Sequence, residues 1–238
     1  MKRILLLAIA SCWFAFVALA APANVIIRVP VGTPMPAGLA PLLAKWRQSG
    51  QVANVLLLTQ GKAETAAYAA KFEAFALLEF SSDADCNRWE KEAAPALPAG
   101  LIVRRADALA HNEISPRDSS RSIFIVNTYT PTVPRERYNE FVQGYIKPLY
   151  EAMRGTTHLV RYTMYHERGE TGKVDSLSVL EYRDSVAFDT ITKVKPDIRA
   201  KLTETVPSYA QFDKIKDTLR TDGHGTRGTY TELPPPGN

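Results

Sequence analysis

Short apolar runs rich in β-branched residues recur along the chain and alternate with amphipathic segments. Val25–Val31 and Ile123–Thr130 predict strands, and each ends in a proline-containing turn. After each turn, apolar residues recur at helical spacing, which predicts an amphipathic helix. Ser82 and Asp184 are suited to cap two later helices. Further strands are predicted at Val52–Thr59, Phe75–Phe80, Thr157–Glu167 and Leu177–Tyr182.

The two halves of the chain resemble each other at a nearly constant offset. Pro36 matches Pro134, and Glu79 matches Glu181. Such a repeat predicts two copies of one structural unit. Each copy is expected to run strand, helix, strand, strand, helix and strand, which is the ferredoxin-like arrangement. The expected parts are a signal peptide at 1–20, repeats at 21–115 and 122–233, a polar linker at 116–121 and a frayed tail at 234–238.

The fourth strand of each repeat is the least defined element. Leu101–Arg104 is the candidate in the first repeat. In the second repeat Pro196–Leu219 has a helical pattern, which postpones the final strand to Thr229–Leu233. His111 and His224 are then expected to lie in loops.

One short signature links both repeats to a known superfamily. Leu78-Glu79-Phe80-Ser81-Ser82 precedes a helix that carries a Trp, and Leu180-Glu181-Tyr182-Arg183-Asp184 repeats the feature. This pattern resembles the dimeric α+β barrel superfamily, which includes monooxygenase-like, EthD-like and stress-responsive proteins. The resemblance implies an α+β fold in which two ferredoxin-like βαββαβ units pair their sheets to form one barrel. Two fused units would close that barrel in one chain, and homodimer formation remains open.

The first twenty residues have the form of an export signal. Basic Lys2 and Arg3 precede an apolar run, and Ala18-Leu19-Ala20 fits the signal peptidase pattern. The run is shorter than the ~20 apolar residues that a membrane span needs, so we expect no stable membrane insertion. The predicted location is periplasmic or secreted, with cleavage after Ala20. A lipobox ending at Cys12 is the less favoured alternative.

Charge and cysteine content narrow the possible class of protein further. The 238-residue chain has 29 Lys and Arg against 25 Asp and Glu, a net charge of +4 that falls to +2 without Lys2 and Arg3. The sequence contains no basic run interleaved with aromatic residues, which is the pattern that would suggest nucleic acid binding. Cys86 is the only cysteine outside the leader, so an intramolecular disulfide is excluded. We expect Cys86 to be a buried apolar residue.

Candidate chemistry is concentrated in the second repeat. In the alignment of the two repeats, Asn127 corresponds to Val29 and Tyr129 to Val31. Strand alternation puts His158, Tyr162 and His166 on one face and Arg161 and Tyr165 on the other, and leaves open which face lines a pocket. The candidate catalytic residues are Tyr129, His158 and Arg161, and the candidate substrate-binding residues are Asn127, Tyr162, Tyr165 and His166.

Metal and cofactor motifs are absent from the sequence. His158 and His166 are ~26 Å apart on an extended strand, too far to share one ion. Some tandem barrels of the superfamily bind haem through a helical His in the second half, whereas the expected helices Arg135–Arg154 and Ser185–Leu219 contain no His. We therefore expect neither metal nor cofactor. Glu79 and Glu181 occur in both repeats, which favours a structural role such as pairing with Arg.

The residues and the resemblance together predict an exported, cofactor-independent enzyme that acts on a small, aromatic or phenolic molecule. Proton transfer of the lyase or isomerase type fits best, because His or Tyr can take a proton and Arg161 or Asn127 can stabilise the anion. Two alternatives stay open: a non-catalytic periplasmic binding or stress-response barrel, and a cofactor-free monooxygenase.

Overall fold

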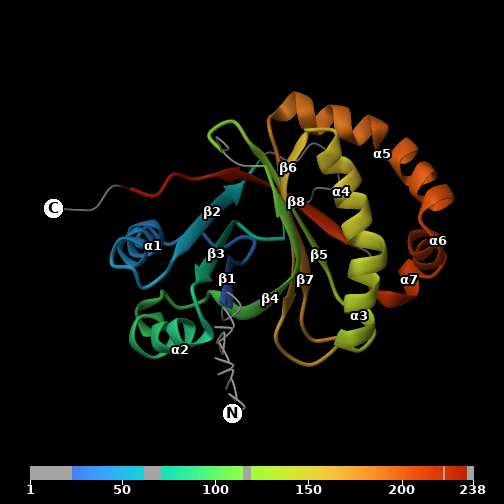
Figure 1. Cartoon of the computed structure of the whole chain (residues 1–238). Coiled ribbons are helices and arrows are strands. Elements are labelled where there is room, and N and C mark those ends of the chain that lie inside the picture. The colour runs from blue at the N-terminus through green and yellow to red at the C-terminus, as the bar shows by residue number, and fades with distance from the viewer. Residues whose placement is uncertain (1–22, 62–70, 115–118, 222, 235–238) are drawn as a thin grey trace, which may run out of the picture.

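A computed structural model describes residues 23–61, 71–114, 119–221 and 223–234. In these residues eight strands form one closed antiparallel barrel, in the order β1-β3-β2-β8-β5-β7-β6-β4 (Figure 1). The first half consists of β1 (Ala23–Val29), α1 (Leu39–Gln48), β2 (Asn54–Gln60), β3 (Ala74–Phe80), α2 (Asp83–Glu92), the 3₁₀ turn η2 (Ala94–Ala96) and β4 (Ile102–Glu113). The second half consists of β5 (Ile123–Tyr129), α3 (Arg135–Phe141), the π-helical turn η3 (Val142–Ile146), α4 (Lys147–Gly155), β6 (Leu159–Glu167), β7 (Ser176–Tyr182), α5 (Ser185–Thr205), α6 (Pro207–Asp213), α7 (Lys216–Leu219) and β8 (His224–Tyr230).

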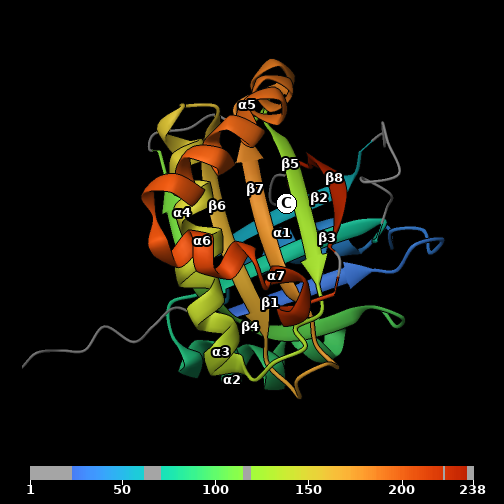
Figure 2. The ribbon, with the colours of Figure 1, turned by 90° about the vertical axis from the view of Figure 1, so that its right-hand side faces the viewer.

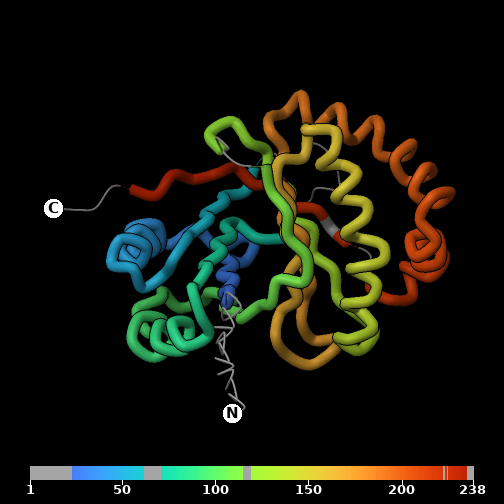
Figure 3. The backbone as a smooth tube through the Cα atoms, viewed as in Figure 1, coloured from blue at the N-terminus to red at the C-terminus, as the bar shows by residue number. Residues whose placement is uncertain are grey.

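The barrel is closed by the last strand of each half. β4 pairs with β1 of its own half and with β6 of the other, and β8 pairs with β5 and with β2. After β8, Thr231 N–H donates to the Leu57 carbonyl, and Leu233 packs in the first-half core. Figure 3 shows this C-terminal segment crossing from the second half to the first. The predicted α+β barrel of two ferredoxin-like units is confirmed.

Three hydrophobic cores result from the alternation of side chains along the strands. Alternate strand residues such as Ile26 and Phe124 fill the barrel interior. The opposite face of each half-sheet is covered by its own helices: α1 and α2 on the first half (Figure 1), and α3 to α7 on the second (Figure 2). Cys86 lies buried in the first-half core, where burial is the main reason that its thiol pKa is raised. No described helix is long and apolar enough to cross a membrane.

One strand prediction was too short, and another was displaced along the chain. The fourth strand of the first half extends to Glu113, so His111 lies within a strand and not in a loop. The last strand is His224–Tyr230 and not Thr229–Leu233, so His224 also lies in a strand. Gly225 and Gly228 weaken the strand signal of this segment. A Cβ at Gly228 would lie 3.2 Å from the Leu58 side chain, so a larger residue there would make a tight contact.

The second-half helices are broken at defined points. The predicted helix at 135–154 contains the π-helical turn η3, which ends just before Pro148. Pro148 has no N–H to donate to the Gly144 carbonyl, and its ring crowds that carbonyl, so the local hydrogen-bond pattern shifts. The predicted helical stretch at 196–219 is three helices, and Pro207 begins α6.

Candidate functional site

A polar band crosses the helix-covered face of the second-half sheet. Tyr129 on β5 lies opposite Ser176 on β7, which lies opposite His166 on β6. In the next row Asn127 lies opposite Ser178. Cross-strand partners point to the same face of a sheet, so these side chains form one continuous polar surface beneath α3 to α5.

The same face of the first half is almost entirely apolar. The row that corresponds to Tyr129, Ser176 and His166 consists of Val29, Ala74 and Thr59. The strand register therefore matches Val29 with Tyr129, a correction of two positions to the sequence alignment. A shift of two residues along a strand keeps each side chain on the same face of the sheet. The contrast between the apolar first half and the polar second half therefore persists.

Arg220 provides a buried positive charge above this band. Its guanidinium lies 3.6 Å from the ring centroid of Tyr129 and 5.1 Å from that of Phe141. Within the described part of the chain Arg220 forms no ion pair, and its Nη1 is buried without a hydrogen-bond partner. Aromatic faces stabilise a cation only in part, so this site is suited to an anion.

A tight contact fixes the Tyr129 ring below Arg220. A Cβ on Gly223 would lie 1.8 Å from Tyr129 Cε1, so only glycine lets the backbone pass so close to the ring. Gly223 therefore helps to hold the Tyr129 ring beneath the guanidinium.

Two further tyrosines border the band. Tyr150 donates a hydrogen bond to Ser178 Oγ at 2.9 Å, and the Asn127 amide donates to the same oxygen at 2.9 Å. The Tyr138 hydroxyl is buried close to both Ser176 and Arg220. Burial raises the pKa of both tyrosines, so both are neutral phenols at physiological pH.

Lys195 on α5 is the second cation near the band. It lines a cavity of about 70 Å³ between α5 and the sheet, together with Asn127. Burial lowers the pKa of Lys195 to about 8, and the positive charges of Arg199 and Arg220 contribute. A substantial fraction of this amine is therefore neutral near pH 8 and able to accept a proton.

The structure brings four of the predicted site residues to the helix-covered face. Asn127, Tyr129 and His166 lie in the band, and burial lowers the pKa of His166. Tyr162 lies on the same face further along β6, where its hydroxyl donates to Glu151 Oε1 at 2.6 Å.

The other three predicted residues lie elsewhere. Arg161 and Tyr165 point into the barrel, and Arg161 forms an ion pair with Glu181 at 3.3 Å. His158 precedes β6 at the end of the sheet far from Tyr129. A bulge between Leu159 and Arg161 breaks the alternation on which the predicted face of His158 rested, and that prediction was wrong.

The two glutamates of the repeat signature have different partners. Glu181 is fully buried, pairs with Arg161 and accepts hydrogen bonds from Ser119 and Ser122. Glu79 accepts a hydrogen bond from Asn54 at 2.9 Å instead. The expected pairing of a signature glutamate with an arginine is therefore found at Glu181.

Sequence reasoning missed both cations of the site. Arg220 follows a short helix in no recognisable motif, and Lys195 lies in a helix with two other lysines. The one available signal was the polar content of β5, because polar residues on a helix-covered strand face need partners from the covering helices.

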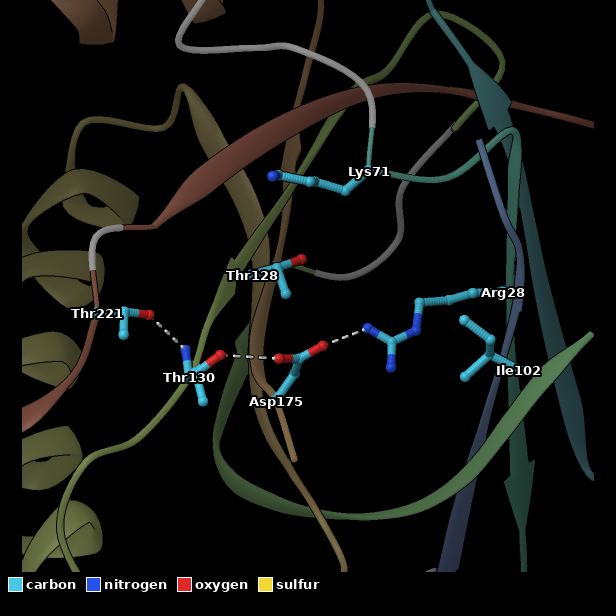
Figure 4. Close-up of a pocket in the computed structure, with 7 residues that line it drawn as sticks. All are labelled: Arg28, Lys71, Ile102, Thr128, Thr130, Asp175 and Thr221. Atoms are coloured by element: carbon cyan, nitrogen blue, oxygen red, sulfur yellow. Dashed lines mark hydrogen bonds and ion pairs between the residues drawn. The ribbon is translucent and has the colours of Figure 1, made fainter. Parts of the chain in front are cut away.

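A larger cavity of about 570 Å³ opens at one end of the barrel (Figure 4). Its charged groups are mostly paired with each other: Arg28 contacts Asp175 at 2.7 Å and Glu167 at 2.6 Å, and Thr130 donates to Asp175. Lys71 extends over this cavity. Because Arg28 is in the first half and both carboxylates are in the second, this cluster joins the halves.

No set of three or more His, Cys, Asp or Glu residues in the described chain is placed to hold a metal ion. The described helices of the second half, α3 to α7, carry no His, whereas His166 lies on the sheet face that they cover.

Comparisons with known proteins support the fold alone. No protein-family model and no curated protein matches this chain. A proposed monooxygenase from Fusobacterium nucleatum superposes with a TM-score of 0.56 at 12% identity, over 90% of this chain and 94% of that one. A proposed monooxygenase from Lactobacillus acidophilus gives 0.53 at 8% identity, over 91% and 97%. The protein has the dimeric α+β barrel fold, with both halves of the barrel in one polypeptide.

Proposed function

We propose that the protein is a cofactor-independent enzyme that transfers a proton on a small aromatic or phenolic molecule. The observation that carries the proposal is Arg220, a buried cation over the Tyr129 ring without a described carboxylate partner. An anion formed on the substrate would supply the missing negative charge, and a preorganised cation in a dry site stabilises such an anion strongly.

In this proposal Lys195 is the base. Its neutral amine takes a proton from a phenolic O–H or an acidic C–H of the substrate, and the resulting anion lies beside Arg220. Asn127 and Tyr129 orient the substrate. Return of the proton from Lys195 to another atom would complete an isomerisation, whereas loss of a leaving group would complete a lyase reaction.

The cavity beside Lys195 is smaller than the roughly 300–1,000 Å³ of typical small-molecule pockets. Substrate entry therefore requires side chains of α5 to move. Ile191 and Thr192 line the cavity from that helix. Pro196 interrupts its hydrogen bonds one residue after Lys195, which favours local adjustment at this point.

Proton exchange in D₂O tests the proposal. The full chain would be incubated with a panel of substituted phenols, aryl ketones and enolisable aryl acids, and deuterium uptake followed by NMR. We expect catalysed uptake whose rate rises about tenfold per pH unit towards pH 8 and then levels off, because the base must be neutral. Lys195→Met should abolish it, whereas Lys193→Met, exposed on the same helix, should not.

A stability measurement checks Lys195 independently of any substrate. The unfolded chain binds the proton of this lysine up to its ordinary pKa of 10.5, while the folded chain releases it near 8. The free energy of unfolding should therefore rise with pH between these values, and Lys195→Met should remove that rise. Catalysed exchange that survives in Lys195→Met would overturn the assignment of the base.

The monooxygenase alternative uses the same anion, with molecular oxygen as the second substrate. Both similar solved structures described above are proposed monooxygenases, which favours testing it. The panel is therefore run with and without oxygen, and oxygen consumption that requires Arg220 would favour the oxygenase. Ligand binding without exchange or oxygen uptake would favour the non-catalytic alternative.

We also propose that the chain is exported, with cleavage after Ala20 to give a soluble periplasmic or secreted protein. Intact mass measurement of protein secreted from a bacterial host should give a chain that begins at Ala21. A diacylglycerol-modified chain beginning at Cys12 would contradict this. The same sample, passed through size-exclusion chromatography with light scattering, tests the homodimer.

A further inference from the structure

A second cavity of about 360 Å³ lies at the end of the barrel opposite the cavity of Figure 4. It is lined near the start of β1 and the end of β3, whereas Arg28 of the first cavity is near the end of β1. It also lies on the inner face of the sheet, away from the band of Tyr129. The proposed function does not use it.

The walls of this cavity are mainly apolar, with a few polar groups that converge from different strands. Ala53, Phe80 and Ala108 supply apolar surface. Tyr165 and His111 point to it from β6 and β4, and His111 Nδ1 is 2.7 Å from Thr163 Oγ1. An apolar cavity with a small number of placed polar groups is typical of a small-molecule site.

Glu79 gives this cavity its charge. It is the only carboxylate among the described lining residues, which include no Lys or Arg. Its Oε2 accepts a hydrogen bond from Asn54, and its Oε1 has no partner among the described residues. The nearby Arg161 is paired with Glu181 and does not compensate Glu79.

Tyr165 adds a second polar group with a fixed protonation state. Burial, followed by the charge of Glu79, raises the pKa of Tyr165, so its phenol keeps its proton. A carboxylate with a free oxygen, a neutral phenol and apolar walls together complement a cationic head group on an apolar body. We propose that this end of the barrel binds a small primary or secondary amine with an aromatic or branched apolar body.

Calorimetric titration with three probes that share a phenethyl body tests the proposal. Phenethylamine carries the ammonium group, 2-phenylethanol is neutral, and 3-phenylpropanoate is an anion. We expect phenethylamine to bind and the other two to bind at least about tenfold more weakly, because a charge-assisted hydrogen bond to Glu79 is lost. Equal affinity for the amine and the alcohol would overturn the proposal.

Variants locate the site. Glu79→Gln should weaken phenethylamine binding by about tenfold or more, whereas Glu204→Gln on the exposed surface of α5 should leave it unchanged. Ala108→Phe should block the cavity without a change in charge. Arg220→Met must still bind the amine, which separates this site from the proposed catalytic one. Binding that survives both Glu79→Gln and Ala108→Phe would overturn the assignment.

Discussion

Replacing Arg28 by Met is expected to lower the free energy of unfolding by about 3–5 kcal/mol, because it leaves a buried carboxylate without its partner. Arg28 lies 2.6 Å from Glu167, and the two side chains are only 11% and 1% exposed. Burial already raises the pKa of Glu167 with Arg28 in place. Without Arg28 the carboxylate must stay charged and unpaired or take up a proton, and either costs stability.

Urea unfolding of the variant measures this loss, and the melting temperature should fall by about 2–4 °C for each kcal/mol. Arg88→Met is the matched control, because Arg88 pairs with Asp85 on the exposed surface of α2 and should contribute less than about 1 kcal/mol. Adding Glu167→Met to Arg28→Met should recover part of the loss. A loss below 1 kcal/mol in the single variant would mean that the pair does not join the halves.

Replacing Arg220 by Met is expected to reduce kcat/KM for the proposed reaction by about 10²–10³-fold, the usual cost of losing a group that stabilises an oxyanion. The same change should leave the free energy of unfolding unchanged or increase it, since the buried guanidinium has no described carboxylate partner. A residue with a purely structural role would show the opposite pattern, with lost stability.

Arg220→Lys should not restore activity, because an ammonium group lacks the planar surface that stacks on Tyr129. Arg137→Met is the control: its guanidinium also lies over an aromatic ring, that of Phe212 at 5.2 Å, but it is paired with Glu140 at the surface. If Arg220→Met unfolds the protein and Arg137→Met does not, Arg220 supports the fold and the proposed anion site is wrong.

Local sequence patterns predicted most of the fold because β1 and β5 are short β-branched runs followed by proline-containing turns. They misplaced β8, where Gly228 lies close to Leu58 of a strand distant in sequence and two glycines lower the strand signal. They also could not reveal the bulge before Arg161, since one extra residue changes the face of His158 without changing the composition of the strand.

The site was predicted in part for the same physical reason. Asn127, Tyr129 and His166 could be identified because polar residues on a covered strand face are unusual. Arg220 and Lys195 could not be identified from the sequence, because the role of each side chain depends on the residues it packs against. A lysine or arginine on a solvated helix has the same sequence pattern as one that helix packing buries.

The contrast between Val29 and Tyr129 depends on the fusion of the two halves. In a symmetric dimer of identical chains every substitution occurs twice, so a residue that improves one site must also be tolerated at its copy. In this chain each half varies alone. The first half can therefore be selected for packing and the second for chemistry, and mutational tolerance should differ sharply between equivalent positions.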